Sequence, residues 1–391
     1  MKIGIFTDSF RPYKSGVVRS IESFSNRLTS MGHEVYVFGP HYPSCEKEEK
    51  VFRFISIPAP TQPDFTIPIP ISLKLGKTIR DLGIDIIHVQ SPFLLGRLGV
   101  KFAKRYNIPL VFTYHTMYDQ YVHYVPFGTS ISKRFIQKMG TSFCNQCDLV
   151  IVPTGIVEDH LKRLGVKAPV AKISTGIDIE EFDRVDSSWL RENYQYNKDE
   201  TLLLHVGRMG KEKNIPFLLK AFKKILKEEP GARLVIVGGG PEENTLQTLV
   251  KDMELGEYVR FTGLLPRNRV IDAYAGADIF VFASLTETQG LVLCEAKMAG
   301  LPLVAIKALG AAEMVEDNVD GFLTNNSLDE FVDKTLLLIK DRDLRTRMGK
   351  TARANAEDMS SQNQTIKLLN VYQSLLERKE DDLQKSPLNK Y

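Results

Sequence analysis

The stretch DIFVFASLTETQGLVLCE, residues 278–295, places a short apolar run before two carboxylates that are separated by a glycine. The first run has the length and composition of a buried strand, and a second apolar run starts after Gly290. If residues 287–295 were all helical, Glu287 and Glu295 would lie about 80° and about 12 Å apart. We therefore predict that Glu287 lies in a loop after the strand, and that Glu295 lies on the second turn of a helix beginning near Gln289–Gly290.

The same order of apolar run, turn and helical spacing recurs along the chain on both sides of this stretch. Strands that alternate with helices indicate a parallel sheet covered on both faces. Between residues 174 and 200 the pattern lapses into a polar, acidic stretch, which we interpret as an interdomain connection. The predicted strands are KIGIF, EVYVFG, DIIHVQ, PLVFTYH and DLVIVPT before this stretch, and TLLLHVG, ARLVIVG, YVRFTG, DIFVFAS and LPLVAI after it.

These patterns predict an α/β fold with two doubly wound, Rossmann-like domains, which a length of 391 residues accommodates. We expect a first domain over residues 1–175, a second over 176–359, and a final segment over 360–391 that begins as a helix and ends in a charged tail. Two such domains leave a cleft between them, and ligands of such sheets bind beyond the carboxyl ends of the strands. We therefore expect the binding and catalytic residues directly after the strands.

Composition and charge restrict the class of protein. The chain is 43% hydrophobic and 25% charged, as soluble globular proteins are. Its apolar runs are shorter than the roughly 18 residues of a membrane-spanning helix, and Asp8 interrupts the N-terminal run too early for a signal peptide. We therefore expect a cytoplasmic protein.

The net charge differs between the two halves of the chain. Residues 1–175 hold 22 Lys and Arg against 13 Asp and Glu, a net charge of +9, whereas residues 176–391 hold 29 against 35, a net charge of −6. Such an asymmetry indicates a surface partner for the first half. Cys144 and Cys147 form one C-x-x-C pair, and without a second pair they do not indicate a zinc site.

Two cations follow the predicted strand TLLLHV at its carboxyl end. Arg208 and Lys213 lie beside a glycine turn, and this pair suits a phosphate or diphosphate, although a solvated basic turn is the alternative. Gly238–Gly240 follow the next strand, where they allow either a ligand to approach the backbone or a plain tight turn. The G-x-G-x-x-G pattern follows none of the strands, which argues against a nicotinamide or flavin dinucleotide.

The two carboxylates of residues 278–295 suit opposite ends of one ligand. A buried Glu295 needs hydrogen-bond donors, which the vicinal hydroxyls of a ribose supply, and Glu287 could accept hydroxyls of a hexose. The amides of Gly290 and Leu291 at the helix N-terminus favour a phosphate between them. The ligand predicted in this way is a nucleoside diphosphate sugar. The alternative is that Glu295 pairs with a neighbouring helix and that Glu287 is solvated.

The first half contributes two further candidates at strand ends. The stretch DSFRPYKSGVV places Gly16 at a helix N-terminus, and TYHTMYDQYVHYVP places His115 before a run of aromatic residues that includes Tyr118. A strand-end histidine with satisfied hydrogen bonds is the alternative for His115.

In combination, these motifs resemble those of retaining glycosyltransferases of the GT-B fold, family GT4. The resemblance rests on E-x7-E at Glu287–Glu295, on the GR…K turn at Arg208–Lys213, on GGGP and on the loop that ends at Gly16, and it extends over nearly the whole chain. Within the family, SGVV, TYHTMYDQYVHYVP and ASLTETQGLVLCEA are most similar to members that transfer a hexose from a UDP-sugar to diacylglycerol. Many members carry an aromatic residue where this chain has Gln289.

The resemblance implies a role for each candidate. Glu295 would bind the ribose, Glu287 the transferred sugar, and Arg208, Lys213 and the Gly16 amide the diphosphate. His115 would lie beside the anomeric carbon, and the backbone of Gly263, Leu264 and Leu265 would meet the base. The first domain would take the acceptor, with Tyr118 on that side, and the last helix would cross back onto it. The product would keep the configuration of the donor, and neither a metal ion nor a cofactor would be needed.

Other functions and acceptors remain open from the residues alone. A UDP-sugar 2-epimerase shares the two-domain fold, and a two-lobed small-molecule receptor is a further alternative. Within the transferases, the acceptor could be diacylglycerol, phosphatidylinositol, a lipopolysaccharide core or a soluble sugar, and a GDP-sugar donor stays possible. We expect no nucleic-acid partner, and the oligomeric state is not predicted.

The stretch SISKRFIQKMGTSF predicts a contact with an anionic membrane surface. It sets Lys133, Arg134 and Lys138 beside Phe135 and other apolar side chains, as an interfacial helix requires. An ordinary amphipathic helix that covers the sheet is the alternative. The expected location is therefore the inner face of the cell membrane, with peripheral attachment.

Overall fold

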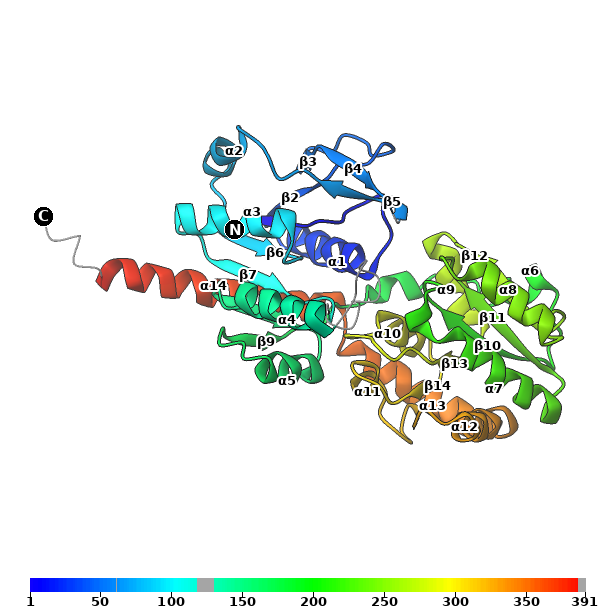
Figure 1. Cartoon of the computed structure of the whole chain (residues 1–391). Coiled ribbons are helices and arrows are strands. Elements are labelled where there is room, and N and C mark those ends of the chain that lie inside the picture. Colours follow the sequence, from blue (N-terminus) through cyan, green and yellow to red (C-terminus); the bar gives the residue numbers. More distant parts are fainter. Residues whose placement is uncertain (61, 118–129, 386–391) are drawn as a thin grey trace, which may run out of the picture. The chain divides into compact units, whose positions relative to one another are not determined.

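A computed structural model describes the backbone of residues 1–60, 62–117 and 130–385, and the side chains of these residues except 62–64, 130–133 and 382–385. The described chain divides into two compact units (Figure 1). Unit 1 contains Met1–Gly176 together with the segment that starts at Ser361, and unit 2 contains Ile177–Ser360. Counted over the whole sequence, unit 1 carries a net charge of +10 and unit 2 a net charge of −7.

Unit 1 is built on a seven-stranded parallel sheet with the strand order β3-β2-β1-β6-β7-β8-β9. Helices cover both faces of this sheet (Figure 1), with α1 and α14 packed against each other on one of them. The elements of unit 1 are β1 (Lys2–Phe6), α1 (Gly16–Ser30), β2 (Glu34–Pro40), β3 (Val51–Phe54), β4 (Ser56–Ala59), β5 (Gln62–Pro68), α2 (Leu75–Leu82), β6 (Ile86–Val89), α3 (Leu94–Tyr106), β7 (Leu110–Thr113), α4 (Ser130–Cys144), β8 (Leu149–Val152), α5 (Gly155–Arg163), β9 (Val170–Lys172) and α14 (Ser361–Lys385).

The last helix completes the core of unit 1 through a buried tyrosine. Tyr372 of α14 is fully buried, and its hydroxyl lies 2.6 Å from Nδ1 of His88 on β6. The other ring nitrogen of His88 lies 2.7 Å from the hydroxyl of Thr113 on β7. Burial lowers the pKa of His88 to about 3, so this chain of polar groups joins α14 to the sheet without a charge.

Unit 2 is built on a six-stranded parallel sheet with the order β12-β11-β10-β13-β14-β15. Alternate side chains of its strands enter two separate apolar clusters, with Leu203 on one face and Leu202 and Leu204 on the other. The elements of unit 2 are a 3-10 turn (Ile179–Phe182), α6 (Trp189–Tyr194), β10 (Thr201–Val206), a 3-10 turn (Lys211–Lys213), α7 (Ile215–Glu228), β11 (Ala232–Val237), α8 (Glu243–Asp252), β12 (Val259–Gly263), α9 (Arg267–Gly276), β13 (Ile279–Phe282), α10 (Leu291–Met298), β14 (Leu303–Ile306), α11 (Ala311–Met314), β15 (Gly321–Thr324), α12 (Leu328–Lys340) and α13 (Arg342–Glu357).

The two parallel sheets confirm the expected α/β class, but the interpretation of residues 174–200 as a connection was wrong for most of that stretch. From Ile177 onward it belongs to unit 2, where Phe182 and Leu190 are buried in the apolar cluster. Arg267 also holds the stretch in place, because its guanidinium donates to the carboxylate of Glu181 at 2.7 Å. A few large apolar side chains are sufficient to pack a segment whose overall composition is polar.

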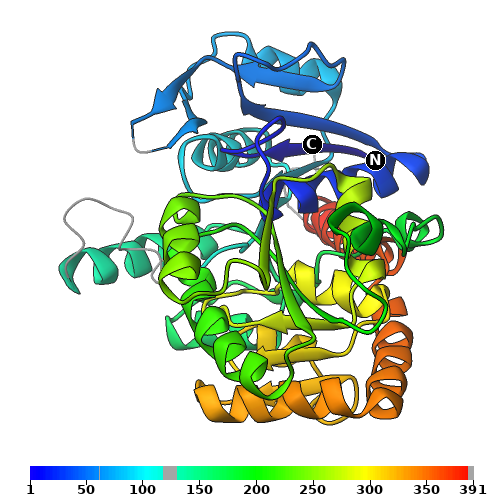
Figure 2. The same ribbon diagram turned by 90° about the vertical axis from the view of Figure 1, so that its right-hand side faces the viewer.

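Four strands of unit 1, β3, β4, β5 and β9, have no counterpart in the sequence prediction. Strands β4 and β5 pair antiparallel as a separate two-stranded sheet, with Ile57 opposite Ile67. This hairpin and the residues after it expose several large apolar side chains: Ile55, Ile57, Ile69, Ile71 and Leu73. Figure 2 shows the hairpin (blue) and the start of α4 (blue-green) extending toward the same side of unit 1, on the left of the view.

Candidate active site

The candidate residues of unit 2 lie at the switch point of its sheet. Strand β10 pairs with β11 on one side and with β13 on the other, so the connections leave β10 and β13 in opposite directions. Arg208 and Lys213 follow β10, and Glu287 follows β13. Ligands of doubly wound sheets bind at this position because diverging loops leave the strand ends open there.

Lys213 and Glu287 form an ion pair between the two strand exits. Both side chains are mostly buried, with exposed fractions of 17% and 16%. Burial alone would raise the pKa of the Glu287 carboxyl, but Lys213 stabilises the anion and holds its pKa below the usual value. The expectation that Glu287 lies in a strand-exit loop is met, whereas the alternative of a solvated Glu287 is not. Arg208 lies exposed on the same turn as Lys213.

Neighbouring loops fix the positions of Lys213 and Glu287. The hydroxyl of Ser284 donates to the carbonyl of Glu212 at 3.1 Å, which joins the exit of β13 to the turn that carries Lys213. On the other side, the amide of Gly310 donates to the carbonyl of Glu287 at 2.8 Å. A Cβ at Gly310 would lie 2.2 Å from the carbonyl oxygen of Thr288, so this close approach requires glycine.

The three glycines after β11 serve the packing of adjacent strand exits. A Cβ at Gly238 would lie 2.0 Å from the carbonyl oxygen of Gly207, and one at Gly240 would lie 2.6 Å from that of Met209. The amide of Met209 also donates to the carbonyl of Gly239 at 2.9 Å. Of the two readings that the sequence left open, the turn that packs backbone against backbone accounts for these glycines.

Glu295 lies on the second turn of α10, where the sequence predicts it, and it pairs with the neighbouring helix α9. One carboxylate oxygen lies 2.6 Å from Nη1 of Arg267, and the other accepts a hydrogen bond of 3.1 Å from the hydroxyl of Tyr274. Glu295 and Tyr274 are buried, and burial together with the Glu295 charge raises the pKa of Tyr274 well above its usual value. Each carboxylate oxygen keeps a lone pair beyond these contacts.

Arg267 is a further residue of this site, and the sequence analysis did not predict a role for it. It opens α9 two residues after Leu265 and bridges two carboxylates, those of Glu181 and Glu295. Burial alone would lower the pKa of its guanidinium, but Glu295 and Glu181 raise it. An arginine at a strand exit, in PRNRV, was the available signal, although its partners lie far away in the sequence.

The remaining candidates of unit 2 are backbone groups. Gly290 precedes α10 in a left-handed conformation with a φ of 81°, so the amide of Leu291 opens the helix as expected. Gly263 ends β12 with a φ of 70°, and its carbonyl accepts from the amide of Gly238 at 3.1 Å. The next side chain, Leu264, is 71% exposed.

Unit 1 places its two candidates at the carboxyl ends of β1 and β7. Gly16 is the first residue of α1, and the hydroxyl of Ser15 caps this helix by accepting from the amide of Val18 at 3.2 Å. His115 follows β7, and its Nε2 lies 2.6 Å from Oε1 of Gln90 after β6. Burial lowers the pKa of His115 to about 4. Tyr118 lies outside the described residues.

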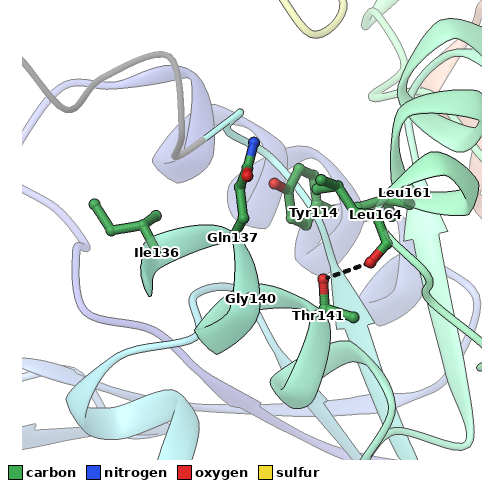
Figure 3. Close-up of a pocket in the computed structure, with 7 residues that line it drawn as sticks. All are labelled: Tyr114, Ile136, Gln137, Gly140, Thr141, Leu161 and Leu164. Atoms are coloured by element: carbon green, nitrogen blue, oxygen red, sulfur yellow. Dashed lines mark hydrogen bonds between the residues drawn. The ribbon is translucent and has the colours of Figure 1, made fainter. Parts of the chain in front are cut away.

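The candidate membrane helix α4 has an exposed face and a packed face. Arg134, Phe135 and Lys138 are exposed, and the side chain of Lys133 lies outside the described residues. On the packed side, Ile136 and Gln137 border a hollow between α4, α5 and the end of β7 (Figure 3). Its volume of about 10 Å³ holds no more than about one water molecule, so we assign it no ligand.

The described His, Cys, Asp and Glu residues include no group of three or more that could hold a metal ion. Within the same part of the chain, none of the helices combines the length and the low polarity that crossing a membrane requires.

Both units are Rossmann-like, and in unit 2 Arg208, Lys213 and Glu287 lie at the strand exits, as the sequence motifs of a GT-B glycosyltransferase predicted. Family models agree with this class: the model of glycosyl transferases group 1 matches residues 187–355, and that of Glycosyltransferase Family 4 matches residues 14–181.

Individual relatives match over most of the chain. The alpha-monoglucosyldiacylglycerol synthase of Streptococcus pneumoniae is 34% identical over 83% of this chain and 75% of its own length. The synthase of the same name from Acholeplasma laidlawii is 31% identical over 98% of this chain and 100% of its own. Among solved structures, a sucrose-phosphate synthase from Thermosynechococcus elongatus is similar with a TM-score of 0.79 and 21% identity, over 96% of this chain and 99% of that one.

The chain therefore belongs to glycosyltransferase family 4, and the GT-B fold is confirmed. It is a glycosyltransferase, as the combined motifs indicated.

Proposed function

We propose that the protein transfers a hexose from a UDP-sugar to the free hydroxyl of 1,2-diacylglycerol, with retention of configuration, to give an alpha-glycosyl diacylglycerol. Glucose is the first hexose to test. The observation that carries the proposal is the match to two alpha-monoglucosyldiacylglycerol synthases over most of the chain. A structure of similar fold, HepE of Anabaena, was solved with UDP and glucose, which supports the choice of donor.

The reaction exchanges one bond at the anomeric carbon. The bond between this carbon and the β-phosphate oxygen breaks, and its electron pair leaves with UDP. The acceptor oxygen then bonds to the same face of the carbon, and its proton passes to the departing diphosphate. Because UDP gains negative charge as it leaves, cations and helix N-termini at the diphosphate lower the barrier.

The residues of unit 2 that are proposed to bind the UDP-sugar can stabilise the charge on the departing UDP. Arg208 and Lys213 would hold the diphosphate, with the amides of Gly290 and Leu291 at the start of α10 as further donors. Glu287 would accept hydroxyls of the transferred sugar, and Glu295 would accept those of the ribose through its remaining lone pairs. The backbone of Gly263, Leu264 and Leu265 would meet the base. We propose that the diphosphate is stabilised by these groups without a metal ion.

The unit 1 candidates complete the assignment of roles. A Cβ at Gly16 would meet nothing within 4 Å, so there is room for the diphosphate to approach the Gly16 amide, as the proposal requires. His115 would lie beside the anomeric carbon. Its low pKa keeps the ring neutral, and a neutral ring does not oppose the positive charge that develops on this carbon.

We further propose that unit 1 binds an anionic membrane surface, where the lipid acceptor is found. Its net charge of +10 attracts anionic head groups, and Arg134, Phe135 and Lys138 expose cations beside an apolar ring on α4. The β4–β5 hairpin extends toward the same side of unit 1 as the start of α4 (Figure 2). Exposed Ile55, Ile57 and Ile69, in or beside this hairpin, offer apolar area for insertion.

The experiment incubates the protein with a panel of UDP- and GDP-sugars and mixed lipid vesicles, and identifies products by mass spectrometry. The proposal predicts a hexosyl diacylglycerol from a UDP-hexose, at a rate that EDTA leaves largely unchanged. A modified free UDP-sugar without a glycolipid would indicate an epimerase. A glycosylated phosphatidylinositol or soluble sugar would reject diacylglycerol as acceptor, and a strict need for a divalent ion would reject the metal-free step.

A further inference from the structure

Strands β6 and β7 carry polar side chains at alternate positions near their carboxyl ends. His88 lies on β6 and Gln90 directly follows it, whereas Thr113 ends β7 and His115 lies two residues further on. The four side chains pair across the two strand ends. His88 is joined to Thr113, whereas Gln90 is joined to His115. The first pair belongs to the core of unit 1 through Tyr372, but the second reaches the residue proposed to face the anomeric carbon.

Gln90 determines which nitrogen of His115 carries the proton. Its side-chain oxygen lies 2.6 Å from Nε2 of His115, and an amide oxygen can only accept a hydrogen bond. With the Gln90 amide in this orientation, Nε2 of His115 carries the proton, and in the neutral ring Nδ1 does not. Gln90 itself is 4% exposed, so its side chain has little freedom to turn away from the ring.

We propose that Gln90 is a positioning residue of the transferase, which fixes the tautomer and the ring orientation of His115 while leaving the ring neutral. The inference rests on the proposed function for its kinetic consequence, but the contact between the two side chains does not. A carboxylate at this position would make the same hydrogen bond and would also stabilise the imidazolium. A neutral acceptor supplies the orientation without the charge.

The surrounding titratable groups do not replace Gln90 in this role. His88 contributes no positive charge near neutral pH, because burial lowers its pKa to about 3. Asp8, at the end of β1, directs its carboxylate to the hydroxyl of Ser91 and to the amide of Leu95, the latter at 2.8 Å. Burial raises the pKa of this carboxyl, against the effect of those hydrogen bonds.

The test compares Gln90→Glu and Gln90→Met in the full-length protein by nitrogen NMR of labelled histidines, with His115→Gln to assign the signal. We expect one tautomer, protonated at Nε2, in the unchanged protein and a mixture in Gln90→Met. In Gln90→Glu the pKa of His115 should rise by about 1–3 units. Exposed Gln247 provides the control, and Gln247→Glu should change neither quantity.

Kinetic measurements then test whether the contact between Gln90 and His115 affects the transfer reaction. Gln90→Met should reduce kcat by about tenfold to a hundredfold at unchanged KM for the UDP-sugar, because the ring is misplaced rather than the donor lost. Gln90→Glu should move the acid limb of the pH–rate profile upward. An unchanged tautomer and pKa in both variants would overturn the inference, as would an altered tautomer with unchanged kcat. If no transfer is found with any acceptor, the proposed function fails, and the NMR result still decides whether Gln90 sets the state of His115.

Discussion

Lys213 and Glu287 neutralise each other across the exits of β10 and β13, although the two residues are proposed to hold different parts of the donor, the diphosphate and the transferred sugar. Lys213 would move to the diphosphate, and Glu287 to hydroxyls of the sugar. Donor binding therefore requires that the pair exchange partners rather than simply gain contacts. An exchange of partners limits the net binding energy but places both charges beside the donor in advance.

Lys213→Met should slow transfer far more than it weakens donor binding. The lost cation stabilises charge that grows on UDP, so about 3 kcal/mol of barrier, or a 10²–10³-fold decrease in kcat, is expected. The variant also leaves Glu287 without its cation, and the pKa of that carboxyl should rise. Single-turnover rates measure the first effect, and the pH dependence of the residual rate measures the second. An increase in KM with kcat unchanged would contradict the proposed role of Lys213.

Glu295→Gln should weaken donor binding by roughly 1.5–3 kcal/mol, the usual effect of losing charge-assisted hydrogen bonds. Arg267 keeps Glu181 as a partner in this variant, so the fold should persist. Calorimetric titration with UDP measures the change, and Glu257→Gln on the exposed end of unit 2 provides the matched control. Unchanged UDP affinity in a folded protein would reject the ribose assignment.

Gly310→Ala should destabilise unit 2 and displace Glu287 together with its loop. The added Cβ would lie 2.2 Å from a backbone oxygen of Thr288, and relief of such a contact typically costs about 1–3 kcal/mol. Gly256→Ala is the control, because a Cβ there meets nothing within 4 Å. Thermal unfolding of both variants tests the comparison, and equal melting temperatures would show that the loop tolerates the side chain.

The protein should lose stability as the pH falls from 6.5 toward 4. Burial lowers the pKa of His88 to about 3 and that of His205 to about 4, whereas the unfolded chain titrates near 6.5. The unfolded chain thus binds protons in this range that the folded chain does not. At pH 5, each of these two histidines lowers the free energy of unfolding by roughly 2 kcal/mol.

Urea unfolding between pH 5 and 7.5 measures this dependence. His205→Phe should weaken the pH dependence of the free energy of unfolding, whereas His41→Gln, at an exposed position, should leave it unchanged. If His205→Phe and His41→Gln depend on pH to the same extent as the unchanged protein, the buried histidines do not account for acid sensitivity.

Replacing Lys133, Arg134 and Lys138 together by Ser should reduce binding to anionic vesicles and lipid glycosylation, while hydrolysis of the UDP-sugar continues. Each cation contributes on the order of 1 kcal/mol near an anionic surface, and salt screens it. Sedimentation with anionic and neutral vesicles at low and high salt provides the measurement. The matched control replaces Lys220, Lys224 and Lys227 on α7 of unit 2, which removes the same charge. Equal binding by the two triple variants would reject α4 as the docking surface.

The sequence predicted the parts of this protein that depend on local pattern. Apolar runs of strand length predicted most strands of the two parallel sheets, though not β3, β9 and β15. Gly290 divided the stretch 278–295 so that Glu287 falls in a loop and Glu295 on a helix. Periodicity is sufficient here because burial on both faces of a parallel sheet leaves a continuous apolar signal in each strand.

What the sequence did not predict depends on partners that lie far apart along the chain. Arg267 reaches Glu295 over 28 positions, and Gly310 contacts the Glu287 loop over 23, so neither contact leaves a local signal. The exposed isoleucines of the β4–β5 hairpin are indistinguishable in composition from core residues. Conversely, Phe182 and Leu190 are buried, but the stretch around them is polar, so the sequence predicted a connection there.

The central claim is that this chain forms an alpha-glycosyl diacylglycerol from a UDP-hexose. The most direct measurement incubates the protein with UDP-glucose and diacylglycerol in anionic vesicles, and determines the anomeric configuration of the purified glycolipid by proton NMR. The account predicts glucosyl diacylglycerol in the alpha configuration, with one UDP released for each molecule formed. A beta-linked product, or release of UDP with free glucose and no glycolipid, would contradict it.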